Sequence, residues 1–217
     1  ERARALDPAG ADVHVVQALL RFEQWLARAL PLAGPEGTFP TAAELDQVWR
    51  EATSPDADLA AAEEHARHVL RSRPWDSTAR SLLAACAFQR AEALYHVSWK
   101  WHRLPQVDGA QALPPAALRE RFSAAADAYA AAAEAGVPKV HLVLHWTRAL
   151  AAAERLDEAI ALHKEALGLD GLAEEHAAAI SQAYFRLAQA QANVAFVAGR
   201  TTSRSPAGRS GSGSGGS

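Results

Sequence analysis

The stretch 140–171 reads VHLVLHWTRALAAAERLDEAIALHKEALGLDG and decides the expected fold. Its apolar residues recur at intervals of three and four, which is the spacing of side chains along one face of an α-helix. The periodicity is interrupted at 155–157 and ends at Gly168 and Gly171. The pattern therefore predicts two helices, over 139–153 and 157–168, that a tight turn joins into an antiparallel pair.

Similar periodic runs lie on both sides of this stretch, separated by proline, glycine and helix-capping residues. Thr41 and Glu44 have the spacing of a capping box, which predicts that a helix begins just after Thr41. Gly136, followed closely by Pro138, predicts a helix end. The other predicted helices cover 12–30, 42–53, 57–72, 77–103, 115–135 and 172–198. With about eight helices and a composition poor in β-branched residues, the expected fold class is all-α.

The composition excludes several classes of protein. Of the 217 residues, 49% are hydrophobic and 22% charged, so the chain can bury a sizeable core and is not disordered throughout. A net charge of −3 gives no general attraction to nucleic acid or to a membrane surface. No apolar run reaches the roughly 18 residues that a transmembrane helix needs. The expected partners are therefore neither nucleic acid nor membrane.

The single cysteine, Cys86, bears on the compartment. One thiol cannot form an intramolecular disulfide, which favours a cytoplasmic location. The alternative that an N-terminal signal sequence has been removed stays open, because the chain contains no Met. Cys86 lies in an alanine-rich apolar run and is expected in the core rather than at a catalytic site. Abundant alanine, and an excess of arginine over lysine, favour a bacterial source.

The stretch 140–171 resembles a tetratricopeptide repeat. Its second helix follows the family's pattern, with Ala159 and Ala166 at the two positions where small residues let the paired helices cross. Residues 63–74 resemble the second helix of another repeat, because Pro74 stands at the family's closing proline. A third phase begins at Glu174, 34 residues after Val140.

The resemblance implies a right-handed α-solenoid, in which antiparallel helix hairpins stack and leave a concave face lined by the first helix of each hairpin. The implied organisation has an N-terminal helical segment of uncertain type over 1–55. Repeats follow over 56–199, with an insertion around 100–115 and a final capping helix. Residues 200–217 read as a flexible polar tail whose Gly/Ser end is typical of an expression linker.

The same resemblance implies a non-enzymatic scaffold or adaptor, which binds a peptide or a partner helix in the concave groove. If the repeat register holds, arginine, amide and aromatic side chains face that groove and are suited to holding peptide backbone or carboxylate. The residues expected to contact the partner are Phe88, Gln89, His141, Leu144, Arg148, Gln182, Phe185 and Arg186.

The densest aromatic stretch, 95–103, adds Trp99 and Trp101 to the expected contact residues. Helical spacing places Tyr95, Trp99 and His102 on one face and Trp101 roughly opposite. Such a helix end is either covered by its neighbours, which the sequence favours, or free to bind a partner.

Catalytic and metal sites are not expected. The chain has no nucleophile elbow and no glycine-rich phosphate loop, and acidic pairs such as Glu63-Glu64 fall where a solvent-exposed face is predicted. His141 and His145 share a helix face, but a third ligand is missing, because His102 is expected about 35 Å away along a parallel helix. No cofactor is therefore expected.

Two other functions stay open at this point. A helical enzyme, or a subunit of one, would form a pocket between 1–55 and the aromatic stretch. A self-assembling protein, possible as a homo-oligomer, would instead use the exposed aromatic side chains of that stretch.

Overall fold

The computed structural model describes residues 10–29, 39–107 and 111–168, together with residues 178, 181, 185, 188 and 189. Within these ranges every regular element is an α-helix, so the predicted all-α class is confirmed. The helices are α2 (Ala11–Ala29), α3 (Ala42–Thr53), α4 (Asp58–Ser72), α5 (Ser77–Val107), α6 (Pro115–Glu134), α7 (Lys139–Ala152) and α8 (Leu156–Ala166).

These helices begin and end close to the predicted ranges, except that α5 continues four residues beyond 103. Pro105 lies in its last turn, and Leu104 beside it is fully buried, which holds this turn against the core. The predicted helix over 172–198 and the tail over 200–217 lie outside the described continuous ranges. The expected count of about eight helices therefore stays a prediction.

Two of the predicted helix boundaries have the expected local structure. The Thr41 hydroxyl accepts a hydrogen bond from the Glu44 amide, and the Glu44 carboxylate accepts one from the Thr41 amide at 2.8 Å, which completes the capping box. Gly136 follows α6 with a φ of +96°, a conformation that a side chain disfavours. The Val137 amide then donates to the Ala132 carbonyl at 3.0 Å and closes the helix end.

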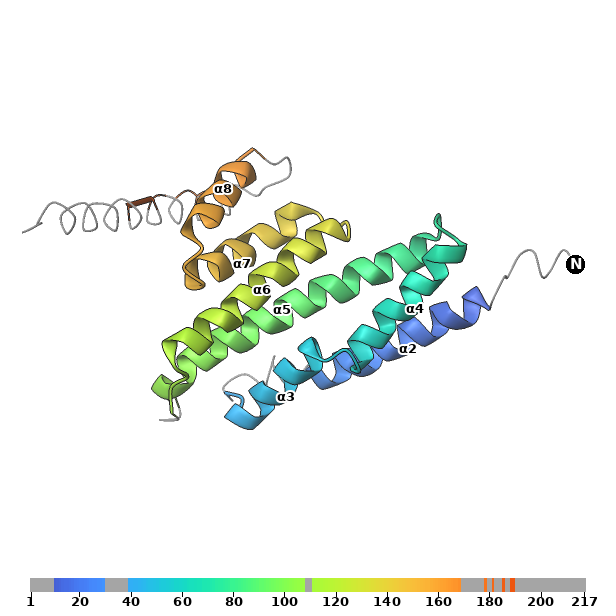
Figure 1. Ribbon diagram of the computed structural model, residues 1–217, viewed down its shortest axis with the longest axis horizontal. Helices are drawn as coiled ribbons and strands as arrows, with labels where there is room; N and C mark the ends of the chain where they lie inside the picture. The colour runs from blue at the N-terminus through green and yellow to red at the C-terminus, as the bar shows by residue number, and fades with distance from the viewer. Residues whose placement is uncertain are drawn as a thin grey trace, which may run out of the picture.

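The long helix α5 runs through the middle of the molecule (Figure 1). Helices α2, α3 and α4 lie on one side of it, and α6, α7 and α8 follow on the other. From α5 onward each helix packs against the next one in the chain. None of the described helices is long and apolar enough to cross a membrane.

Helix α2 buries a face of small residues and one tryptophan, and not the face that carries most of its larger apolar residues. Ala11, Ala18 and Trp25, spaced seven residues apart, are buried where α2 packs against the core. Small alanine side chains let the axes of α2 and α4 approach closely, which explains why this face is the buried one. The larger apolar residues on the other side are exposed, namely Val13, Val16, Leu19 and Leu20.

Helices α3, α5 and α6 meet at a stacked cluster of side chains. The Arg121 guanidinium lies 4.7 Å from the ring centre of Trp49 and 5.3 Å from that of Trp101, and it pairs with Asp46 at 2.8 Å. Trp101 is only 7% exposed. Burial, which the sequence favoured for this helix end, is therefore confirmed for Trp101, and its expected contact with a partner stays a prediction.

Glu63 was predicted to lie on a solvent-exposed face, but in the structure its side chain is buried. Its carboxylate pairs with Arg90 of α5 at 2.6 Å and with Arg67 at 2.9 Å. Arg90 in turn donates to the Ala52 carbonyl, so one charged network connects α3, α4 and α5. A buried carboxylate is tolerated here because it is paired with cations.

Candidate functional site

Two hollows lie along the facing sides of α5 and α7. The first has a volume of about 620 Å³ and the second about 430 Å³. Phe88 and His141 line the first, whereas Tyr95 and Arg148 line the second. From the first hollow to the second, the residue numbers increase on both helices, so α5 and α7 run in the same direction. We call the surface that includes both hollows the α5–α7 groove.

The two hollows differ in chemistry. The first is lined by His141 of α7 and mostly by small and apolar residues of α5 and of the turn before α7: Ser81, Ala84, Ala85, Phe88, Gly136, Val137 and Pro138. The second is lined by the aliphatic Leu118 and Ala152 and by aromatic and basic side chains: Tyr95, Trp99, His102, Phe122 and Arg148. No acidic side chain is among the described residues that line either hollow.

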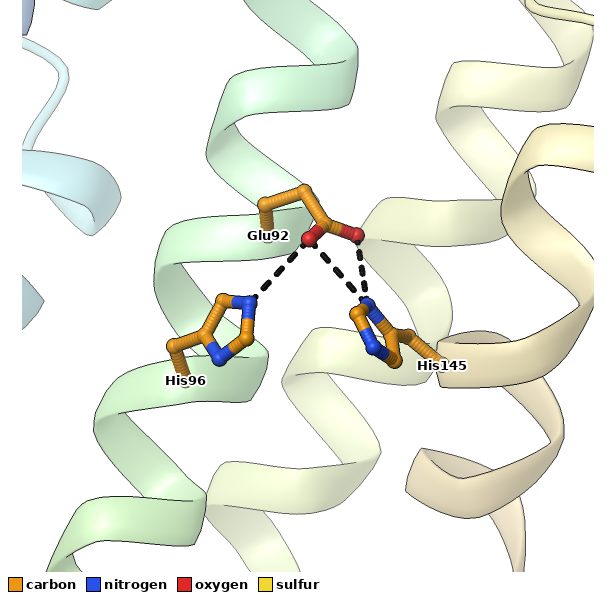
Figure 2. Close-up of side chains that lie close together, drawn as sticks. All are labelled: Glu92, His96 and His145. Carbon is orange, nitrogen blue, oxygen red and sulfur yellow. Dashed lines mark hydrogen bonds and ion pairs between the residues drawn. The ribbon is translucent and has the colours of Figure 1, made fainter. Parts of the chain in front are cut away.

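Between the hollows, Glu92 and His96 of α5 meet His145 of α7 (Figure 2). Nδ1 of His145 lies 3.1 Å from each carboxylate oxygen of Glu92, and Nε2 of His96 lies 3.2 Å from Oε2. Glu92 and His96 are one helical turn apart, which places both on the same face of α5. We call these three residues the Glu–His–His cluster.

Tyr129 of α6 supports this cluster. Its hydroxyl donates a hydrogen bond to Oε1 of Glu92 at 2.5 Å, and its side chain is fully buried. Burial disfavours the charged carboxylate, but the hydrogen bonds from His145, His96 and Tyr129 outweigh burial and hold the pKa of Glu92 far below its usual range. Burial and the neighbouring Glu92 carboxylate both raise the pKa of Tyr129, so its hydroxyl stays protonated.

The ring of Tyr95 fixes the orientation of His145. The two rings stack with their centres 4.6 Å apart and their planes 16° from parallel. Tyr95 also lies edge-on to His96, with ring centres 5.3 Å apart. Both imidazoles are therefore positioned by an aromatic ring that is itself only 5% exposed.

The structure brings together several of the residues predicted to contact a partner. Phe88 and His141 share the first hollow, and Trp99 and Arg148 share the second. Tyr95, Trp99 and His102 lie on one face of α5, as helical spacing predicted, while Trp101 is buried on the other.

The remaining predicted residues are not part of this arrangement. Gln89 and Leu144 are partly buried and line neither hollow. Phe185 is exposed, whereas Gln182 and Arg186 lie outside the described residues.

Sequence reasoning missed Glu92 and His96. Their spacing of four residues within the otherwise apolar stretch 91–97 was the available signal. The prediction instead paired His145 with His141 on its own helix. In the structure His141 is exposed in the first hollow, and His145 is directed at the neighbouring helix.

Two further groups lie away from the groove. Cys86 is buried, so its predicted place in the core is confirmed, and burial raises the pKa of its thiol to about 12. His14 of α2 lies against His65 and His68 of α4, with Nδ1 of His14 and Nδ1 of His65 2.9 Å apart.

Comparison with protein-family models, with curated proteins and with solved structures finds no match to this chain. The resemblance of 140–171 to tetratricopeptide repeats therefore stays a prediction.

Proposed function

We propose that this protein is a non-enzymatic interaction module that binds an extended, acidic peptide segment of a partner protein in the α5–α7 groove. The observation that carries this proposal is the alignment of an apolar hollow and a cationic hollow along two parallel helices. Such a groove offers one recognition position for an apolar side chain and a second for a carboxylate.

The first hollow supplies the apolar position. Its lining includes the surfaces of Ala84, Ala85 and Pro138 and the partly buried ring of Phe88. The small alanine side chains on α5 leave the space that a partner's leucine, valine or phenylalanine would fill. Burying such a side chain stabilises a complex by about 1.5–3 kcal/mol.

The second hollow supplies the polar position. Arg148 is exposed there, beside Trp99, which is 42% exposed. A guanidinium binds a carboxylate through two parallel hydrogen bonds, and exposed tryptophan adds contact area for the peptide backbone. Because the described lining contains no acidic side chain, the charge of this hollow is complementary to an acidic ligand.

The spacing of the hollows limits the peptide. Phe88 and Tyr95 are seven residues apart on α5, which corresponds to about 10 Å along a helix axis. An extended peptide covers this distance in about three residues. For a peptide that runs in the same direction as α5, the preferred ligand therefore has an apolar residue followed by Asp or Glu three positions later.

The packing order α5, α6, α7, α8 supports a stack of two hairpins with α5 and α7 as their groove-lining helices. This is the arrangement that a tetratricopeptide-like α-solenoid would have, and it forms part of the proposal. A bacterial source and a cytoplasmic location also remain proposals, which rest on composition. The arginine-bearing tail over 200–217 lacks acidic residues, so charge does not favour it as the groove's occupant.

A peptide array with fluorescence-anisotropy titrations tests the proposal. Peptides with the apolar-x-x-acidic pattern should bind the wild-type chain, and Arg148→Gln should weaken binding about tenfold or more, since a hydrogen bond to a charged group contributes about 1.5–3 kcal/mol. Arg119→Gln is the matched control, because Arg119 is an exposed arginine of α6 that pairs with Glu154. Equal binding by the wild type and Arg148→Gln, or a preference for basic peptides, would overturn the proposal.

A further inference from the structure

We propose that Glu92, His96 and His145 form a binding site for one first-row divalent transition-metal ion, such as Zn²⁺. Among the residues that the structure describes, these three are the group of His, Cys, Asp and Glu side chains whose ligand atoms all lie within 4.8 Å of one another. This inference rests on the cluster alone and does not depend on the proposed peptide binding.

The distances within the cluster fit a coordination sphere. Metal–nitrogen and metal–oxygen bonds of about 2.0–2.2 Å place neighbouring donor atoms roughly 2.9–3.5 Å apart in octahedral or tetrahedral geometry. The nitrogens of His145 and His96 lie 3.1 and 3.2 Å from Glu92 oxygens, which is within that range. Figure 2 shows both imidazole nitrogens directed at the same carboxylate, so an ion can be accommodated by small side-chain rotations.

The donor set selects the class of metal. Two imidazole nitrogens and one carboxylate oxygen suit Zn²⁺, Co²⁺, Ni²⁺ and Cu²⁺, whereas Mg²⁺ and Ca²⁺ prefer sites built from oxygen donors. Three protein ligands leave at least one coordination position for water or for a donor from another molecule. His96 is 44% and His145 28% exposed at the side chain, so such a donor can reach a bound ion.

The residues around the cluster already hold its ligands in place. The Tyr129 hydroxyl binds one oxygen of Glu92 and thus orients the carboxylate, while Tyr95 stacks on His145. Supporting interactions of this kind usually raise metal affinity 10- to 100-fold, because less ordering of the ligands is needed on binding. The Glu92 carboxylate and both imidazoles already point toward one another, so the site is largely formed before the ion arrives.

The other histidine cluster is a weaker candidate, and the experiment must separate the two. This second group consists of His14 of α2 and of His65 and His68 of α4, and it contains no carboxylate. Its ring nitrogens do not all lie within 4.8 Å of one another, as the ligand atoms of the Glu–His–His cluster do. His65→Ala therefore removes the alternative site and leaves the Glu–His–His cluster unchanged.

Isothermal titration calorimetry of chelator-treated protein with ZnCl₂ at pH 7.5, repeated with CoCl₂ and its visible absorption, tests the site. We expect one tight equivalent in the wild type, at least a tenfold loss of affinity in His96→Ala, His145→Ala and Glu92→Gln, and no change in His141→Ala, His65→Ala and Arg148→Gln. His96 is partly exposed, so its variant is expected to fold, which circular dichroism checks.

Three results would overturn the site. The first is the absence of any stoichiometric Zn²⁺ binding. The second is equal affinity in the wild type and in folded His96→Ala. The third is loss of binding in His65→Ala but not in His145→Ala. Loss of peptide binding in Arg148→Gln with Zn²⁺ binding retained would separate this inference from the proposed function.

Discussion

The hydroxyl of Tyr129 donates a 2.5 Å hydrogen bond to Oε1 of Glu92 and so connects α6 to α5 between the two hollows of the groove. Because Tyr129 is fully buried and Glu92 is charged, this bond stabilises the fold as well as the cluster. Tyr129→Phe removes only the oxygen. We expect it to lower the free energy of unfolding by about 1.5–3 kcal/mol, as measured by urea denaturation. A change below about 0.5 kcal/mol would show that water replaces the hydroxyl without loss.

Glu154, in the turn between α7 and α8, has a φ of +62°, a conformation that favours glycine. The Arg155 amide donates to the Leu150 carbonyl at 2.9 Å and closes the helix end around it, as the corresponding bond does at Gly136. Glu154→Gly should therefore be more stable than Glu154→Ala by about 1 kcal/mol in chemical denaturation. Both variants lose the ion pair with Arg119, so the comparison isolates the backbone; equal stability of the two would contradict it.

We expect His65 to make the fold sensitive to acid. Burial and the neighbouring His14 lower the pKa of His65 below its ordinary value of 6.5; Arg21 and His68 also lower it, and Glu64 opposes them. In the unfolded chain His65 takes up its proton at higher pH than in the fold, so its contribution to stability is complete above pH 6.5 and is lost as pH falls through the lowered pKa.

Urea midpoints measured between pH 7.5 and pH 5 should therefore fall for the wild type and fall less for His65→Gln. Chelator is included throughout, so that metal binding does not contribute. Parallel curves for the two proteins would show that His65 is not the group responsible.

Cys86 should be unreactive in the native protein. It is buried, and its thiol has a pKa of about 12, so almost no thiolate is present at pH 8. A chromogenic disulfide reagent should label the chain at least 100-fold more slowly than it does in urea. Because Cys86 is the only cysteine, the signal has one source. Rapid labelling of folded protein would contradict the burial of α5 against its neighbours.

Helix boundaries were predictable because they depend on local chemistry. The Thr41 capping box and the Gly136 helix end involve residues within a few positions of each other, and the structure contains both. The face that α2 buries was not predictable in this way. Its sequence carries larger apolar residues on one side and alanines with Trp25 on another, and only close packing against α4 decides between them.

The candidate site was predictable in part. The spacing within α5 indicated that Tyr95, Trp99 and His102 share a face, and the expected groove residues Phe88 and Arg148 do line hollows. The meeting of Glu92 with His145 was not predictable, because it depends on how far α7 is displaced along α5, and 53 residues separate the two in the chain.

The most direct test of the groove is an NMR titration of the isotope-labelled chain with the best apolar-x-x-acidic peptide. We predict that the largest amide shift changes fall on α5 from Ser81 to Trp99 and on α7 from His141 to Ala152. Changes centred instead on the exposed side of α2, around Val16 and Leu20, would contradict the account and assign partner binding to that helix.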